Sequence, residues 1–184
     1  MSDKKIYISA NEFLIDSFKL ARKIKDSGFK PSFIVAIWRG GTPVGIVVHE
    51  YLKYYGIETN HIAIKTSRYE GIGKARRNVK VHGLDYIVDC ANADDKLLLV
   101  DDVFDEGYSI DAVLKELKKR MGKNLPREIK VAIIYYKPKN NKTNIKPDFY
   151  IHETNEWIIF PHEVCGLSKE EIKKKGVEIA ALFD

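Results

Sequence analysis

Four carboxylates fall within six positions of the segment LLLVDDVFDEGYS, which spans residues 97–109. They are Asp101, Asp102, Asp105 and Glu106. Because like charges this close repel one another, the pKa of one or more of these groups rises unless something compensates. A metal ion, the hydroxyl groups of a ligand or backbone N–H groups could compensate for this repulsion. The cluster is therefore a candidate site for a metal ion or for the hydroxyl groups of a sugar.

The residues after the acids could hold a phosphate. Gly107 and Ser109 lead into a helical pattern, and a helix N-terminus offers free N–H groups and the positive end of the helix dipole. A ribose 5-phosphate needs this combination of hydroxyl acceptors and a phosphate seat. The alternative is an acidic surface turn in which Ser109 is a simple N-cap. The apolar run before the acids and the helical pattern after them favour the functional interpretation.

A second loop, Trp38-Arg39-Gly40-Gly41-Thr42-Pro43, also lies between an apolar run and a helical pattern. Adjacent glycines allow backbone N–H groups to approach an anion closely, and Arg39 adds a forked cation. Taken alone, the same residues would also suit an ordinary strand-to-helix turn. The position of this loop one buried strand ahead of the acidic loop favours an anion site.

The elements that would position these loops alternate between strand and helix. The apolar runs at 33–38, 97–100 and 129–136 predict strands buried on both faces, and 57–64 predicts a weaker strand. Residues 66–80 are polar, basic and glycine-containing, and predict a mobile loop. The chain from Lys137 onward predicts an irregular tail. Together these patterns predict an α/β fold with a mainly parallel sheet, in which ligands bind beyond the carboxyl ends of the strands.

Three helices are expected, one before the first strand and two between strands. Ser9 and Glu12 have the spacing of a capping box, and this first helix should end near Gly28. Its buried face is predicted to carry three apolar residues: Leu14, Phe18 and Ala21. The second helix is predicted to start at Thr42-Pro43 and to stop at Gly56. The third should end at Gly122. Its apolar residues at helical spacing are Ile110, Val113, Leu114, Leu117 and Met121.

Length and composition narrow the class of protein. The 184 residues suit a single domain, 1–184, and no apolar run approaches the ~20 residues that span a bilayer. Two distant cysteines, Cys90 and Cys165, support neither a zinc site nor a disulfide framework, so we expect a cytoplasmic protein. The net charge of +5 permits an anionic ligand or a nucleic acid without requiring either.

The acidic segment resembles the phosphoribosyl-diphosphate (PRPP) signature of the type I phosphoribosyltransferases. That signature has two acidic residues, two or three spacers, and then Asp-Thr-Gly-x-Thr. In this chain Glu106 replaces the usual Thr, Tyr108 fills the spacer position and Ser109 keeps the hydroxyl. The resemblance implies the family fold, a twisted and mainly parallel sheet flanked by helices, with a small C-terminal hood over the base built mainly from residues 137–165.

The resemblance also implies roles for both loops. Asp101 and Asp102 would hold the ribose hydroxyls, directly or through a Mg²⁺ ion. The 5-phosphate would be seated by five residues: Asp105, Glu106, Gly107, Tyr108 and Ser109. Arg39, Gly40 and Gly41 correspond to the pyrophosphate-binding loop of the purine enzymes, in which the peptide before the basic residue, here Trp38–Arg39, is often cis.

Further positions resemble the 6-oxopurine branch of the family. Lys137 would donate to the exocyclic oxygen of the base, while Trp157 would stack on the base and Ile158 would offer backbone groups to its edge. Glu163 matches an acidic residue that helps to hold a metal–pyrophosphate unit. In isolation, Lys137 would be interpreted as a surface lysine and Trp157 as a core aromatic.

Two residues of the polar segment 66–80 match a loop that closes over the reaction centre in the family. They are Ser67 and Tyr69, although this chain has one inserted residue between them. Without the resemblance, the segment would be interpreted as a solvated basic loop.

The function that this resemblance implies is transfer of 5-phosphoribose from PRPP to N9 of a 6-oxopurine, with release of pyrophosphate, in purine salvage. Asp105 would be the catalytic residue that takes the proton from N7 of the base, and Mg²⁺ would be the cofactor. The partners would be PRPP, a purine base and further copies of the chain. The alternatives are a transferase that uses another base and a PRPP-binding regulator without transferase activity. We expect no membrane or nucleic-acid partner, because 184 residues leave no room for an added DNA-binding module.

Overall fold

The computed structural model describes residues 5–68 and 79–183. Its centre is a six-stranded sheet with the order β4-β3-β2-β5-β6-β7. These strands are β2 Phe33–Trp38, β3 Asn60–Arg68, β4 Val79–His82, β5 Lys96–Phe104, β6 Glu128–Tyr136 and β7 Phe149–Glu153. All neighbouring pairs are parallel except β3 and β4. The predicted α/β fold with a mainly parallel sheet is confirmed.

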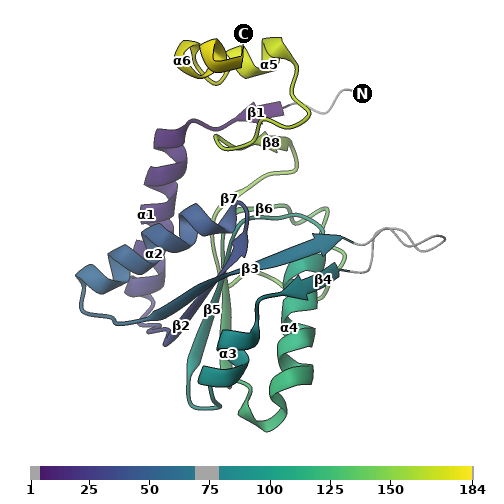
Figure 1. Cartoon of the computed structure of the whole chain (residues 1–184). Coiled ribbons are helices and arrows are strands. Elements are labelled where there is room, and N and C mark those ends of the chain that lie inside the picture. The colour runs from purple at the N-terminus through teal and green to yellow at the C-terminus, as the bar shows by residue number, and fades with distance from the viewer. Residues whose placement is uncertain (1–4, 69–78, 184) are drawn as a thin grey trace, which may run out of the picture.

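Helices cover both faces of this sheet, as Figure 1 shows. The helices α1 Ala10–Asp26 and α2 Gly41–Tyr54 bury their apolar residues in one core. The helices α3 Asp85–Cys90 and α4 Tyr108–Met121 bury theirs in a second core on the opposite face. A sheet that is covered on both faces explains why β2, β5 and β6 are continuous apolar runs without alternation.

A second, two-stranded sheet joins the start of the described chain to its C-terminal part. In it β1 Lys5–Tyr7 pairs with β8 Trp157–Ile159 in parallel. The short helices α5 Lys169–Lys173 and α6 Val177–Ala180 lie beside it at one end of the molecule (Figure 1). The prediction of an irregular tail is therefore wrong: β7 extends the main sheet, β8 pairs with an N-terminal strand, and α5 and α6 follow. The partner strands, β6 and β1, both precede the tail, so the sequence of the tail alone does not predict these pairings.

Several element boundaries differ from those predicted. The strand β3 continues to Arg68 because β4 pairs with its second half, Ser67 opposite Lys80. The ends of the predicted loop 66–80 are thus strand, and residues 69–78 lie outside the described residues. The helix α2 begins at Gly41 with Gly40 as N-cap, so Thr42 is not the cap that the sequence suggested.

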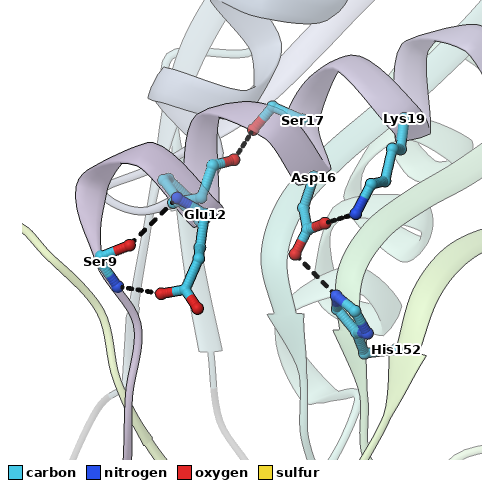
Figure 2. A network of polar contacts seen from close by, with 7 residues as sticks. Ser9, Glu12, Asp16, Ser17, Lys19 and His152 are labelled. Atoms are coloured by element: carbon cyan, nitrogen blue, oxygen red, sulfur yellow. Dashed lines mark hydrogen bonds and ion pairs between the residues drawn. The ribbon is translucent and has the colours of Figure 1, made fainter.

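The first helix has the predicted capping box, but its buried face was predicted incorrectly. The backbone N–H of Glu12 donates to Ser9 Oγ, and the backbone N–H of Ser9 donates to the Glu12 carboxylate (Figure 2). Leu14 and Phe18 are 46% and 43% exposed, whereas Ala21 is buried. The inward face carries Phe13, Asp16, Ser17, Leu20 and Ile24. Two polar residues on that face interrupt the apolar pattern and so concealed it.

The buried Asp16 ties α1 to β7. Its Oδ1 accepts a hydrogen bond from Lys19 Nζ at 2.8 Å, and its Oδ2 lies 2.7 Å from His152 Nε2 (Figure 2). Burial by itself raises the pKa of Asp16, but the hydrogen bonds from Lys19 and His152 outweigh it and leave the pKa below the usual 3.8. The ionised carboxylate is therefore the form that the fold stabilises.

We expect Asp16→Asn to lower the free energy of unfolding by about 1–3 kcal/mol at pH 7, because the ionised acceptor of two hydrogen bonds is lost. A carboxyl group with a lowered folded-state pKa stabilises the fold above its unfolded pKa, and that stabilisation disappears as the pH falls through the folded pKa. Urea unfolding at pH 7 and at pH 3 should show the difference shrinking at the lower pH. The control is Asp26→Asn on the same helix, whose half-exposed ion pairs should contribute little to stability because solvent screens them. If Asp16→Asn lost the same free energy of unfolding at both pH values, the stabilising role of the ionised Asp16 carboxylate would be contradicted.

No helix in residues 5–68 and 79–183 is long and apolar enough to cross a membrane.

Candidate phosphoribosyl site

The acidic segment lies at the carboxyl end of β5, where a cavity of about 220 Å³ opens. Its lining comprises the segment from Val103 to Ile110 together with Asp101. The neighbouring strand β2 pairs with β5 only as far as Val100, although β2 itself continues to Trp38, where the glycine loop begins. The partner on the other side, β6, continues to pair up to Phe104. Asp101 and Asp102 are therefore strand residues, and not loop residues as the sequence suggested.

The first two acids face the glycine loop. A backbone N–H of Gly41 donates to the Asp101 carboxylate, and a Cβ added to Gly40 would lie 1.6 Å from Asp102 Oδ2. Asp101 Oδ1 also accepts the N–H of Asp102, and Asp102 Oδ1 accepts the N–H of Val103. The structure thus brings together the two loops that the sequence singled out. Backbone N–H groups supply part of the compensation that the acid pair needs.

Burial dominates the electrostatics of this pair. It raises the pKa of Asp102 to about 6, with a smaller contribution from the charge of Glu163. Burial and the neighbouring charge of Asp102 together raise the pKa of Asp101 well above its usual value. The pair therefore binds protons more readily than exposed carboxylates do, and a cation or a set of hydroxyl donors would favour the ionised form.

The carboxylates suit Mg²⁺, which prefers oxygen ligands and commonly keeps several waters while it contacts one or two carboxylates and substrate phosphates. The described residues hold no group of three or more His, Cys, Asp and Glu side chains that could bind a metal ion by themselves. Glu163 is close enough to the pair for its charge to raise the pKa of Asp102. The preceding residue, His162, places its Nε2 3.8 Å from Asp102 Oδ2. The carboxylate of Glu163 accepts the N–H of Phe160.

The proposed phosphate seat is a helix N-terminus without a side-chain cap. The helix α4 begins at Tyr108 with Gly107 as N-cap, and this glycine has no side chain that could cap the N–H groups of the first turn. The alternative in which Ser109 is the N-cap is therefore wrong. Gly107 has φ +84°, and a Cβ there would lie 2.7 Å from the Phe104 ring and from Thr143 Oγ1. Only glycine fits here, and N–H groups of a first helical turn are the donors that suit an anion.

The third acid meets the segment that follows β6. Asn140 Nδ2 donates to Asp105 Oδ1 at 2.7 Å, and Lys137 Nζ lies 3.4 Å from Asp105 Oδ2. Sequence reasoning missed Asn140, because nothing in the run Lys-Pro-Lys-Asn-Asn distinguishes it from a residue of an ordinary polar turn. Contact with Asp105, 35 residues earlier in the chain, is visible only in the fold.

Lys137 and Trp157 lie together beside Asp105. Lys137 is only 5% exposed, so it is not an ordinary surface lysine, and its Nζ lies 5.7 Å from the centroid of the Trp157 ring. Trp157 is 54% exposed and so is not a core aromatic, whereas Ile158 is buried. A buried cation and an exposed aromatic ring next to a carboxylate form a surface suited to a planar, polar ring.

The comparisons with known proteins agree with this geometry. Residues 5–169 match the family model described as "Phosphoribosyl transferase domain". The chain belongs to this family. No curated protein sequence matches the chain.

Solved structures with the same fold as this phosphoribosyltransferase include enzymes named for purine bases. A purine phosphoribosyltransferase from Pyrococcus horikoshii is 29% identical, with a TM-score of 0.67 over 89% of this chain and 97% of that one. The xanthine-guanine-hypoxanthine phosphoribosyltransferase of Helicobacter pylori is 22% identical, with a TM-score of 0.62 over 86% and 91%. A hypothetical protein from Neisseria gonorrhoeae with bound ppGpp is 21% identical, with a TM-score of 0.76 over 100% and 99%. The predicted type I fold is confirmed.

Two further expectations concern the rim of the phosphoribosyltransferase site. The Trp38–Arg39 peptide is cis, as the resemblance implies. Ser67 lies in β3, paired with β4, and Tyr69 lies outside the described residues. The role of these two residues in closing a loop over the reaction centre stays a prediction.

Proposed function

We propose that this phosphoribosyltransferase transfers 5-phosphoribose from PRPP to N9 of a 6-oxopurine and releases pyrophosphate. The observation that carries the proposal is the grouping of Lys137, Asp105 and Trp157. A 6-oxopurine presents O6 and N7 side by side on one edge. The Lys137 ammonium, which has only donors, suits O6, and a carboxylate 3.4 Å away suits a protonated N7. Trp157 offers a ring face for stacking.

The remaining residues take the roles that the resemblance implies, and their positions support those roles. Asp101 and Asp102 hold the ribose hydroxyls, and the N–H groups at the start of α4 hold the 5-phosphate. Arg39 and the Gly40–Gly41 backbone hold the pyrophosphate. Asp101 and Asp102, with Glu163 nearby, would hold Mg²⁺ together with the phosphates of PRPP. The bound ion would supply positive charge against the leaving pyrophosphate.

Proton transfer is assigned to Asp105. As the bond from N9 to the sugar forms, N7 becomes more acidic, and Asp105 Oδ2 takes its proton. Positive charge that develops on the sugar when the bond to pyrophosphate breaks is stabilised by the fixed carboxylates nearby.

The first test is pyrophosphate release with PRPP and Mg²⁺ against adenine, hypoxanthine, guanine, xanthine, uracil and orotate. Turnover with one or more oxopurines, and none with adenine, is the expected result. Turnover with a pyrimidine alone would contradict the roles given to Lys137 and Trp157. Binding of PRPP without turnover on any base would favour the alternative of a PRPP-binding regulator.

We expect Lys137→Gln to relax the preference for oxopurines. A glutamine amide can accept as well as donate, so the amino group of adenine is no longer rejected by a group that only donates. The ratio of kcat/KM for hypoxanthine to that for adenine should fall at least about tenfold, because one hydrogen bond to a charged group is worth roughly that much. A matched control is Lys139→Gln, an exposed lysine of the same turn. An unchanged ratio in Lys137→Gln would remove Lys137 from this role.

A further inference from the structure

Both oxygens of the Asp105 carboxylate face the segment after β6, but they are held differently. The 2.7 Å contact from Asn140 Nδ2 to Oδ1 is a short hydrogen bond to a charged acceptor. The 3.4 Å contact from Lys137 Nζ to Oδ2 is long. Oδ1 is thus firmly occupied, while Oδ2 can still accept a proton or a second donor.

The amide orientation of Asn140 follows from chemistry. An ionised carboxylate only accepts hydrogen bonds, so the NH₂ group of Asn140, and not its carbonyl oxygen, must face Asp105. The half-buried position of Asn140 restricts other arrangements of its side chain.

The backbone around Asn140 is fixed to the acidic loop independently of its side chain. The N–H of Lys137 donates to Phe104 O at 2.9 Å, and the N–H of Asn140 donates to Lys137 O at 3.1 Å. The N–H of Lys142 donates to Glu106 O at 3.0 Å. Removing the side chain of Asn140 therefore leaves the turn attached and removes only its contact with Asp105.

We infer that Asn140 is a positioning residue for Asp105. By fixing Oδ1, its amide sets the plane of the carboxylate and turns Oδ2 toward Lys137 and toward the N7 position of a bound base. The inference rests on the proposed function, and it adds a residue that the sequence motifs do not contain. Without this hydrogen bond the Asp105 side chain can rotate, and the geometry required for proton transfer is reached less often.

The test is single-turnover kinetics at saturating PRPP with the oxopurine that the wild-type enzyme uses, because product release can mask the chemical step in steady state. Asn140→Ala should slow the single-turnover rate constant about tenfold, and PRPP affinity measured by calorimetry should change less than about twofold. Asn140→Asp has the same shape but replaces the donor with an acceptor of like charge. It should slow the reaction about a hundredfold.

The neighbouring Asn141 provides the matched control. Its Nδ2 donates to Ile145 O and its Oδ1 accepts from Thr143, so it stabilises the turn without contacting Asp105. Asn141→Ala should lower the melting temperature, while the single-turnover rate of the folded enzyme should stay within about threefold of wild type.

The outcomes separate the two proposals. Wild-type turnover with an Asn140→Ala rate within twofold of it would overturn the role of Asn140 and leave the proposed function intact. A parallel loss of rate and PRPP affinity in Asn140→Ala would also overturn it, since that pattern indicates damage to the whole loop. Absence of wild-type turnover on every purine would overturn the proposed function and this inference with it.

Discussion

Asp105→Asn is expected to lower kcat about 10²–10⁴-fold, the range typical of a lost general base. Asparagine keeps the size of the side chain, and its carbonyl oxygen can still accept the hydrogen bond from Asn140. Its NH₂ group then replaces Oδ2 and faces the Lys137 ammonium, donor against donor, 3.4 Å away in the native arrangement. It can take no proton from N7. Affinity for PRPP should change little, because the other acids and the α4 N-terminus remain.

The measurement is kcat with an oxopurine, together with the dissociation constant of PRPP from calorimetry. Asp94→Asn is a suitable control, since Asp94 lies at the surface in an exposed ion pair with Arg127. It should leave both quantities within about twofold, as expected for a surface ion pair. Equal losses of turnover and PRPP affinity in Asp105→Asn would indicate a structural role for Asp105 and contradict the proposed one.

Gly41→Ala is expected to weaken PRPP binding about ten- to hundredfold and to lower the free energy of unfolding by about 1–3 kcal/mol, as for overpacking of a tight site. The new Cβ would lie 2.5 Å from Val100 O and 2.9 Å from Asp101 Cα. Both are backbone atoms of β5, so rotation of a side chain cannot relieve the contact. The glycine loop must move away from the acid pair, and residue 41 then no longer donates its backbone hydrogen bond to the Asp101 carboxylate.

Gly28→Ala separates this local effect from general destabilisation. Gly28 has φ +78° and open space around its Cα, so alanine there costs about 1 kcal/mol of backbone strain. That variant should be less stable than wild type yet should bind PRPP with unchanged affinity. The interpretation of Gly41 would be contradicted if both variants lost PRPP affinity equally, or if Gly41→Ala bound PRPP as wild type does.

The family and the two anion loops were predictable from local sequence because their chemistry is local. Asp101 to Ser109 form a contiguous motif, and Arg39 to Gly41 form another. Each follows an apolar run long enough to identify a buried strand. In a parallel sheet the carboxyl ends of β2 and β5 lie at one edge, so the two loops had to be neighbours.

The hood was only partly predictable, because its parts are distant in sequence. The resemblance implied that Lys137 and Trp157 act together. In the structure Lys137 Nζ lies 5.7 Å from the centroid of the Trp157 ring. The strand that pairs with the Trp157 segment comes from the other end of the chain, at Lys5–Tyr7. A three-residue strand has too few side chains to show a period of two, so sequence pattern cannot identify it.

The sequence by itself determined the fold class and singled out the two loops at the carboxyl ends of β2 and β5, because each strand, helix and loop pattern is local in the chain. Only the tertiary structure decided which face of α1 is buried, since Asp16 finds a partner at His152 across the fold. It also decided that Asn140 contacts Asp105 across 35 residues. A polar side chain reveals its role only through its partner, and the fold alone brings such distant partners within hydrogen-bonding distance.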